Sequence, residues 1–241
     1  FYRFVGIHRW GGYAEFVTVP SENAFKIPER ISFPEAAVIV RHLPTALHLL
    51  SIKGKLKAGE WVLVMGATGG LASCCVQAAK KLGATVIAGA GADDRVDAAI
   101  NYFGADFGIN YRAKNLAEEV KKITGGRGVD LVADNIGDPD LWSGSMESLA
   151  SMGRLVTAGA HAGTTASIDL KQLYLRRQTI IGSPGCNFSD VESALKMVED
   201  GSIKAPIIHK IFPLHEASEA HSLVEEGNFA GKILLDPMMS N

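Results

Sequence analysis

Short apolar runs alternate with amphipathic runs along the chain from residue 61 to residue 185. An apolar run bounded by turn residues is typical of a buried strand, whereas apolar residues three and four positions apart indicate a helix with one buried face. This pattern predicts six strands, at Trp61–Gly66, Thr85–Ala88, Phe107–Asn110, Val129–Ala133, Arg154–Ala158 and Thr179–Gly182. It also predicts helices over about residues 71–82, 93–103 and 116–123.

The order of these elements predicts an α/β fold. Near-continuous apolar strands, each followed by a helix, are typical of a parallel sheet that is covered on both faces. Six such strands match a doubly wound, six-stranded Rossmann sheet. In that fold a dinucleotide binds outside the carboxyl ends of the strands, at the point where the strand order reverses.

The segments on either side of this alternation show a different pattern. Aromatic, glycine and proline residues recur in residues 1–40, with an extended stretch at Tyr13–Val19. Strand-like runs return at Ile207–Phe212 and Lys232–Leu235. We therefore expect both flanks to form parts of one β-rich second domain, which Glu35–Ile52 would join to the sheet as a helix. The predicted domains are residues 1–43 together with 187–241, and the Rossmann domain at residues 44–186 between them.

Composition narrows the classes of partner. Of the 241 residues, 47% are apolar and 21% are charged, and the formal net charge is −2. Such a charge does not attract a polyanion over a broad surface, so we expect no nucleic-acid partner. No apolar run approaches the roughly 20 residues that cross a bilayer, so we expect no membrane partner either.

The cysteine pattern and the first residues indicate the cellular compartment in which we expect the protein. Cys74 and Cys75 are neighbours, Cys186 stands alone, and no C-x-x-C pair occurs. This pattern disfavours a disulfide framework or a cysteine-rich zinc site and suits a reducing cytoplasm. Phe1–Phe4 shows no signal-peptide pattern, and because residue 1 is not methionine we expect the chain to be a piece of a longer one.

A glycine-rich loop, Ala67–Ala72, follows the first predicted strand and opens the next helix. Backbone N–H groups at the positive end of a helix bind a pyrophosphate, and glycines let the chain approach it without a Cβ atom. Alanines stand at the first and third glycine positions of the G-x-G-x-x-G pattern, so the strand–turn–helix context carries the prediction. The predicted phosphate-binding residues are Ala67, Thr68, Gly69, Gly70 and Leu71. The alternative is a glycine-rich turn without a ligand.

The end of the second predicted strand indicates which nicotinamide cofactor binds. Proteins that bind NAD usually place a carboxylate there for the ribose hydroxyls. This chain has Ala88–Gly91, in which Gly89 and its small neighbours leave room for a 2′-phosphate, and Arg95 follows as a cation. We expect Asp93 and Asp94 to serve as the N-cap and first turn of the next helix. The prediction is NADP, with NAD as the alternative.

Several short motifs follow one another in an order that resembles a known superfamily. They are Gly11–Val17 with Pro20, Phe33–Ala37, Thr45–Ala46, Ala67–Ala72, Gly104–Asp106, Ile109–Arg112, Thr124–Asp130, Gly153–Val156 and Gly231–Ile233. Over nearly the whole chain they resemble the medium-chain dehydrogenase/reductase superfamily, on the side of zinc-type alcohol dehydrogenases and quinone oxidoreductases. The resemblance implies that the second domain is a GroES-like, partly open β-barrel, whose larger part would precede Phe1.

The resemblance also implies roles for particular residues. It implies that Thr45 faces the nicotinamide as a catalytic residue, that Tyr111 lines the adenosine pocket and that Lys232 reaches toward the cofactor phosphates. It implies that two strand ends flank the nicotinamide ring, through Asn135, Ile136, Gly137, Gly159, Ala160 and His161. Alternatives stay open, because Tyr111 would also suit a surface aromatic and Lys232 a solvated lysine.

Zinc-dependent members of the superfamily provide a further comparison. One of their zinc ligands is a cysteine four residues before the threonine that corresponds to Thr45, and this chain has Arg41 there. Arginine cannot replace a thiolate on zinc. The other ligands would lie before Phe1. We therefore expect no metal site in this chain, and we take His42, which we expect to begin a helix, as a second catalytic candidate.

These observations predict an oxidoreductase that transfers hydride between a nicotinamide and a carbonyl, quinone or activated alkene. Hydrogen-bond donors such as His42 or Arg41 would polarise the substrate in place of zinc. One alternative is a zinc-dependent alcohol dehydrogenase whose ligands precede this chain, and another is a non-catalytic nucleotide-binding or sensing protein. Because Thr179–Gly182 should form an exposed sheet edge, we expect a homodimer or a larger assembly through it.

Overall fold

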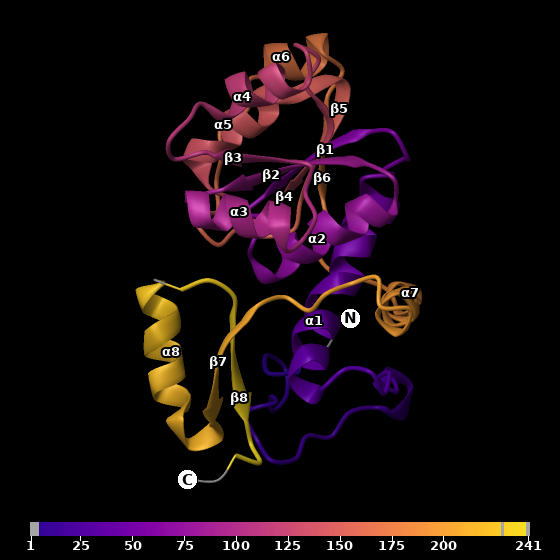
Figure 1. Cartoon of the computed structure of the whole chain (residues 1–241), viewed down its shortest axis with the longest axis vertical. Coiled ribbons are helices and arrows are strands. Elements are labelled where there is room, and N and C mark those ends of the chain that lie inside the picture. The colour runs from indigo at the N-terminus through magenta and orange to yellow at the C-terminus, as the bar shows by residue number, and fades with distance from the viewer. Residues whose placement is uncertain (1–4, 228, 240–241) are drawn as a thin grey trace.

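A computed structural model of the chain describes residues 5–227 and 229–239. An upper part is built on a parallel sheet, and a lower part contains both ends of the described chain (Figure 1). Helix α1 (Phe33–Leu47) runs between the two parts. The opening Phe1–Phe4, in which no leader pattern was expected, lies outside the described residues.

The upper sheet has six parallel strands in the order β3-β2-β1-β4-β5-β6. They are β1 (Trp61–Met65), β2 (Thr85–Ala90), β3 (Phe107–Asn110), β4 (Val129–Asp134), β5 (Leu149–Thr157) and β6 (Thr179–Gly182). The order reverses between β1 and β4, which is the arrangement of a doubly wound Rossmann sheet. The predicted α/β fold class is therefore confirmed.

Two strands extend by two residues or more beyond the boundaries that the apolar pattern predicts. β2 continues past the predicted end to Ala90, because Ala90 still pairs with Asn110 of β3. β5 begins before its predicted start, at Leu149, because Leu149 pairs with Val129 across an irregularity in the register. Pairing with a neighbouring strand, which one segment alone does not reveal, decides both boundaries.

Alternate residues of each strand point to opposite faces of the sheet, and both faces are covered. Val62 and Val64 of β1 pack in a core that includes α1 and α2 (Gly70–Lys81). Leu63 and Met65 pack on the other face, in a core that includes α4 (Leu116–Ile123) and α5 (Pro139–Glu147). This two-sided burial explains why the strands have no polar alternation.

The helices confirm three predictions and correct one detail. Helices α2, α4 and α3 (Asp93–Asn101) lie where the spacing of apolar residues places them. The N-cap of α3 is Ala92, so the expected N-cap role of the aspartates is wrong, and Asp93 and Asp94 both lie in the first turn. Carboxylates there face the positive end of the helix dipole. Helices α5 and α6 (Leu170–Leu175) were not predicted, since they bury too few apolar residues for a clear helical period.

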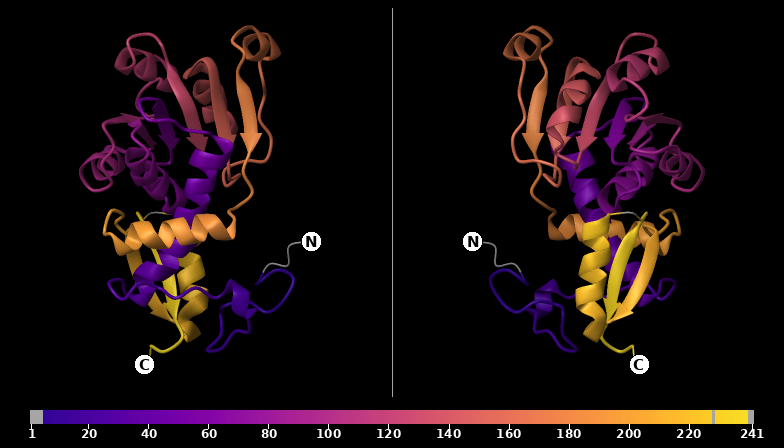
Figure 2. Two further views of the ribbon diagram at one scale, coloured as in Figure 1. Left: turned by 90° about the vertical axis from the view of Figure 1, so that its right-hand side faces the viewer. Right: turned by 90° about the vertical axis from the view of Figure 1, so that its left-hand side faces the viewer.

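Helix α1 begins earlier than predicted because a capping box defines its start. The Ser32 side chain accepts from the Glu35 N–H, and a Glu35 carboxylate oxygen accepts from the Ser32 N–H at 2.8 Å. The helix then continues into a π-helical segment, η2 (His48–Lys53). Helix α7 (Phe188–Glu199) crosses α1 (Figure 2), and the imidazole Nδ1 of His48 lies 2.8 Å from a carboxylate oxygen of Asp190.

The lower part contains the two predicted C-terminal strands. β7 (Ile208–Pro213) and β8 (Lys232–Asp236) pair in parallel, and η3 (Leu214–Glu216) and α8 (Ala217–Glu226) connect them. The extended stretch at Tyr13–Val19 is not a strand, and the nearest regular element is the short η1 (Ser21–Asn23). A strand needs a neighbour for its N–H and C=O groups, and Tyr13–Val19 has none among the described residues.

The helices also show whether one of them could cross a membrane. Within residues 5–227 and 229–239, every helix is too short or too polar to span a bilayer.

Candidate cofactor and active site

All six strands of the upper sheet are parallel, so their carboxyl ends meet at one edge. The predicted site residues follow these ends in turn. The phosphate loop follows β1, Gly89 lies near the end of β2, and Tyr111 follows β3. Asn135 and Gly159 follow β4 and β5. Residues far apart in the sequence are thereby collected along one edge, which is where ligands of doubly wound folds bind.

The phosphate loop leaves a helix N-terminus free of side-chain capping. Gly69 is the N-cap of α2, and no side chain caps it. The N–H of Ala67 donates to the carbonyl of Gly89 at 3.0 Å, and the N–H of Gly69 donates to the carbonyl of Gly66 at 2.8 Å. These two bonds hold the turn. The N–H groups left for an anion are therefore those of the first helical turn, which begins at Gly70 and Leu71.

The His42 ring lies directly against Gly70, so a larger residue at position 70 would displace the ring. A Cβ atom on Gly70 would be 2.4 Å from Nε2 of His42. His42 does not begin a helix, as we had expected, but lies inside α1, because the capping box starts that helix at Phe33. The packing of α1 against α2 brings the imidazole to the phosphate loop.

A cavity of about 420 Å³ lies beside this loop. The predicted site residues in its lining are His42, Thr45, Leu71, Gly159, His161 and Lys232. Arg41 also lines it, so α1 and β8 each contribute a basic side chain to the cavity. Their positive charge, together with the N-terminus of α2, suits an anionic ligand.

The imidazole of His42 is neutral at neutral pH. Burial, followed by the charges of Lys232 and Arg41, lowers the pKa of His42 to about 4. A neutral imidazole has one N–H donor and one acceptor nitrogen. His42 can therefore form hydrogen bonds in the cavity without adding a third positive charge.

Thr45 lies one helical turn further along α1 and is 7% exposed. The thiol of Cys186, in the loop after β6, lies close enough for Thr45 to lower its pKa. Burial raises the pKa of the Cys186 thiol, so the thiol stays protonated at neutral pH.

The ends of β4 and β5 interlock. The carboxylate of Asp134 accepts the N–H groups of Ile136 and Gly137 at 3.2 and 3.4 Å. The N–H of His161 donates to the carbonyl of Ile136 at 2.8 Å. A Cβ atom on Gly159 would lie 2.5 Å from the carbonyl oxygen of Asn135. The two turns therefore form one rigid shelf, and burial raises the pKa of the Asp134 carboxyl that holds it.

The remaining residues of the shelf also contact their neighbours closely. Asn135 donates its side-chain N–H to the carbonyl of Met65 at 3.2 Å. The Ile136 side chain would lie 3.2 Å from a Cβ atom on Gly66, the residue just before the phosphate loop. Ala160 packs against Gly137, where a Cβ atom would lie 2.7 Å from the Cα of Ala160. The shelf thus contacts the end of β1 and Gly66, which leads into the phosphate loop.

A second group of predicted residues lies at the ends of β2 and β3, apart from the cavity. Tyr111 is half-buried, packs against the core, and has a pKa raised chiefly by burial. Its ring lies 3.6 Å from the Cβ position of Gly89, and its hydroxyl 3.3 Å from that of Gly91. Arg95 is close enough to affect the pKa of Tyr111. The structure therefore groups Tyr111, Gly89 and Arg95 together, and none of them lines the cationic cavity.

Three residues that line these places were not predicted to have roles. Arg112 lies 3.3 Å from the Cβ position of Gly91, Asp134 holds the shelf, and Ser183 lines the cavity. Each stands at the carboxyl end of a strand or just beyond it. The strand-end rule that selected Asn135 and Gly159 would have selected Ser183 as well, since Ser183 follows β6 directly.

The donor set does not fit zinc. Among residues 5–227 and 229–239, no three His, Cys, Asp or Glu side chains are grouped so that they could hold a metal ion. At the position where the resemblance implies a cysteine ligand, the side chain is the guanidinium of Arg41, which lines the cavity. A guanidinium offers no lone pair to a metal.

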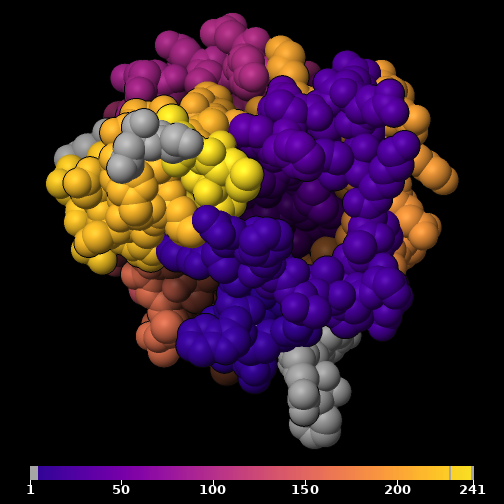
Figure 3. Space-filling view, turned by 90° about the horizontal axis from the view of Figure 1, so that it is seen from below, coloured from indigo at the N-terminus to yellow at the C-terminus, as the bar shows by residue number. Residues whose placement is uncertain are grey.

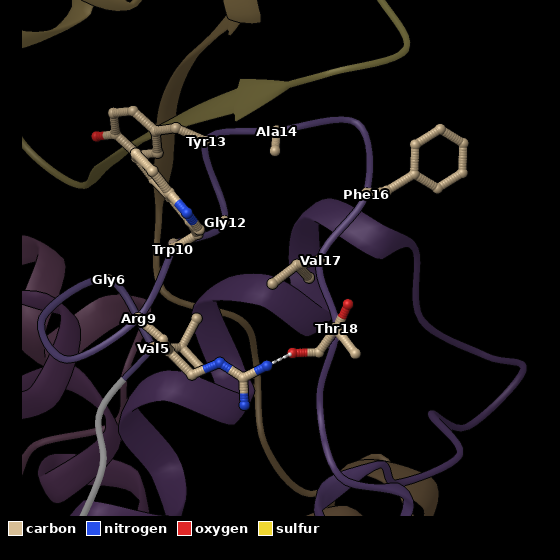
Figure 4. A pocket seen from close by; sticks show the side chains of 11 residues that line it. Val5, Gly6, Arg9, Trp10, Gly12, Tyr13, Ala14, Phe16, Val17 and Thr18 are labelled. Carbon is tan, nitrogen blue, oxygen red and sulfur yellow. Dashed lines mark hydrogen bonds between the residues drawn. The ribbon is translucent and has the colours of Figure 1, made fainter.

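A larger cavity lies elsewhere and is a poor candidate for the site. Its volume is about 1060 Å³, and residues between Val5 and Thr18 line it. Seen from below, this N-terminal segment borders a hollow (Figure 3). Phe16 is 89% exposed and points away from the hollow, and the only bond drawn there joins the Arg9 guanidinium to the Thr18 carbonyl (Figure 4).

Comparison with known proteins places this geometry in a family. The family model described as "Zinc-binding dehydrogenase" matches residues 70–200. The chain is 32% identical to "Quinone oxidoreductase-like protein 2" of Bos taurus, over 97% of this chain and 69% of that protein. It is also 32% identical to "2-haloacrylate reductase" of Burkholderia sp, over 94% of this chain and 71% of that protein.

A solved structure gives the same result. The crystal structure of an "NAD-dependent alcohol dehydrogenase" superposes with a TM-score of 0.91 at 35% sequence identity, over 97% of this chain and 67% of that one. The sheet order and the phosphate loop define a dinucleotide-binding protein of the Rossmann class. The chain belongs to the zinc-binding dehydrogenase family within the medium-chain dehydrogenase/reductase superfamily, and it is a nicotinamide-dependent oxidoreductase.

Proposed function

We propose that this protein is an NADPH-preferring reductase of carbonyls, quinones or activated alkenes. The observation that carries the proposal is the single cavity that joins Thr45, His42 and Lys232 to the phosphate loop and the shelf. A bound nicotinamide would supply hydride from its C4 carbon. The names of two relatives, a quinone oxidoreductase-like protein and a 2-haloacrylate reductase, support a quinone or an activated alkene as the acceptor.

The cofactor would lie along the carboxyl edge of the sheet. Gly70 and Leu71 would bind its pyrophosphate at the start of α2, where Lys232 would offset the negative charge. Tyr111 would contact the adenosine beside Gly89. The nicotinamide ring would lie on the shelf, flanked by Asn135, Ile136, Gly137, Gly159, Ala160 and His161.

The substrate would be polarised by side chains of α1. Thr45 and His42 each place a hydrogen-bond donor in the cavity, and donors already in position stabilise charge that develops on an oxygen. The guanidinium of Arg41 would attract that same oxygen. We propose Thr45 and His42 as the catalytic residues, with Arg41 beside them.

Arg95 should determine the choice between NADPH and NADH. No carboxylate stands at the end of β2 to repel a 2′-phosphate, and Arg95 is a cation without an ion pair among the described residues. Removing one charge-assisted contact to phosphate costs about 1.5–3 kcal/mol, which is roughly tenfold or more in affinity. We expect calorimetry to show tighter binding of NADPH than of NADH, and Arg95→Ala to reduce that preference at least tenfold.

The control removes a charge of the same sign elsewhere. Lys196 is exposed on α7, away from the strand ends, so Lys196→Ala should leave the preference unchanged. Equal affinities of the unchanged protein for the two cofactors would contradict the proposal, as would an Arg95→Ala variant that keeps the full preference.

Turnover distinguishes an enzyme from a nucleotide sensor. NADPH absorbance should fall when the protein is mixed with a panel of quinones and activated alkenes. Oxidation of alcohols instead would favour the second candidate, an alcohol dehydrogenase, which the likeness to an NAD-dependent alcohol dehydrogenase supports. Binding of NADPH without turnover of any substrate would favour a non-catalytic nucleotide-binding protein.

The edge strand β6 suits a symmetric assembly. β6 ends the sheet order and leaves one row of backbone groups unpaired. Apolar side chains of α6, which precedes β6 in the chain, are exposed, with Leu170, Tyr174 and Leu175 at 70%, 67% and 60%. We expect a homodimer or a larger assembly that joins two sheets at β6. Light scattering at micromolar concentration should give at least twice the chain mass, and a monomer mass would contradict the expectation.

Two further proposals concern organisation and location. We propose residues 44–186 as the cofactor domain and residues 1–43 with 187–241 as part of the substrate domain, with α1 crossing between them. The thiols of Cys74, Cys75 and Cys186 are all free, which suits a reducing compartment such as the cytoplasm.

A further inference from the structure

Ser183 has a buried hydroxyl with no hydrogen-bond partner. The residue follows β6 directly and is 3% exposed. Its backbone N–H continues the sheet by donating to the carbonyl of Thr157 at 2.9 Å, whereas its side-chain oxygen has no partner. A buried polar group without a partner destabilises the folded protein. Such a group in a native protein therefore calls for an explanation, for example a catalytic role or a bound ion.

The Ser183 hydroxyl differs from the other unpaired buried groups in its location. In the part of the chain that the structure describes, two more buried side-chain atoms lack partners, the indole nitrogen of Trp142 and the amide oxygen of Gln178. Trp142 belongs to the core under α5, and Gln178 still donates its amide N–H to Met146 at 3.4 Å. Ser183 alone of the three lines the cavity of the active site.

The cavity has a cationic side and a largely neutral side. Arg41 and Lys232 come from α1 and β8, whereas the ends of β5 and β6 contribute Gly159, Ser183 and Gly185. A phosphate suits the cationic side. A neutral polar group of the cofactor suits the strand ends, and a serine hydroxyl, which both donates and accepts, complements an amide that does the same.

We propose that the Ser183 hydroxyl binds the carboxamide of the nicotinamide ring. The inference rests on the proposed function, since it assigns a residue to the ring of the cofactor proposed there. A hydrogen bond to the carboxamide limits rotation of the ring and holds one of its faces toward Thr45. Hydride transfer depends on such alignment, because the donor and acceptor carbons must be held in contact at a defined angle.

The test compares two ligands that differ only in the nicotinamide. NADP⁺ carries the ring, and 2′-phospho-ADP-ribose is the same molecule without it. By calorimetry, Ser183→Ala should weaken NADP⁺ binding by about three- to tenfold, as expected for one neutral hydrogen bond. It should leave the affinity for 2′-phospho-ADP-ribose unchanged.

The outcomes separate this inference from the proposed function. If the unchanged protein binds both ligands and Ser183→Ala leaves NADP⁺ affinity intact, the inference is overturned and the proposed function stands. Equal weakening of both ligands also overturns it, because the effect then lies outside the ring. If the unchanged protein binds neither ligand, nor NAD⁺ and ADP-ribose, the proposed function fails first and the inference fails with it.

Thermal stability provides an independent readout. Because the Ser183 hydroxyl has no partner in the protein, Ser183→Ala should not lower the Tm of the ligand-free protein. Ser148 is the matched control, since it is fully buried and its hydroxyl donates to the carbonyl of Gly144 at 2.7 Å. Ser148→Ala should lower the Tm and leave the ratio of the two affinities unchanged. A lower Tm for ligand-free Ser183→Ala would mean that the hydroxyl has a structural partner and would overturn the assignment.

Discussion

Replacing Gly159 with alanine should lower kcat/KM for NADPH-dependent reduction by about 100-fold. The new Cβ atom would lie 2.5 Å from the carbonyl oxygen of Asn135 and 3.1 Å from its carbonyl carbon. Both are backbone atoms, so the contact is relieved only if the ends of β4 and β5 move apart. That movement tilts the shelf on which we place the nicotinamide, and a displacement of about 1 Å is enough for a loss of this size. Steady-state kinetics with a quinone measures it.

A second glycine-to-alanine change serves as the control. It shows whether a loss of activity comes from the position of Gly159 or from replacing any glycine with alanine. Gly144 lies inside α5, and a Cβ atom there would meet Leu116 at an ordinary 3.6 Å. Gly144→Ala should therefore keep full activity and raise stability by about 0.5–1 kcal/mol, as alanine does inside helices. A Gly159→Ala variant as active as Gly144→Ala would show that the shelf does not hold the ring.

Acidification should destabilise the protein through His42. The folded-state pKa of His42 is about 4 and the ordinary value is 6.5, so between these pH values the unfolded chain binds the proton more readily. Stability from the neutral imidazole is fully present above pH 6.5 and is lost as the pH falls toward 4. The difference corresponds to about 3 kcal/mol of unfolding free energy. Denaturant titrations at pH 7 and pH 4 measure it.

Carboxylates also titrate between pH 7 and pH 4, so variants are needed to show how much of the lost stability comes from His42. His42→Gln cannot take up the proton, so its stability should fall by about 3 kcal/mol less than that of the unchanged protein over this interval. His215 is an exposed histidine in η3, and His215→Gln should retain the whole loss. If His42→Gln shows the same acid sensitivity as the unchanged protein, burial beside Lys232 and Arg41 does not control this titration.

The strands and the phosphate loop could be predicted because their signals are local. A strand covered on both faces is apolar at every position, as in Val62–Met65, and a loop that turns closely at a helix start needs Gly69 and Gly70. The prediction failed where local composition is ambiguous. Tyr13–Val19 has the residues of a strand and no partner strand among the described residues, and α5 has a helix without a clear apolar stripe.

Local sequence alone determined the fold class, the parallel sheet and the row of candidate residues at the strand ends. Those features depend on the spacing of apolar and glycine residues within single elements. Tertiary structure decided which candidates share a site. The packing of α1 on α2 sets the His42 ring against Gly70, and the return of β8 brings Lys232 to the same cavity. It also left the Ser183 hydroxyl buried without a partner, which depends on atoms from several elements that only folding brings together.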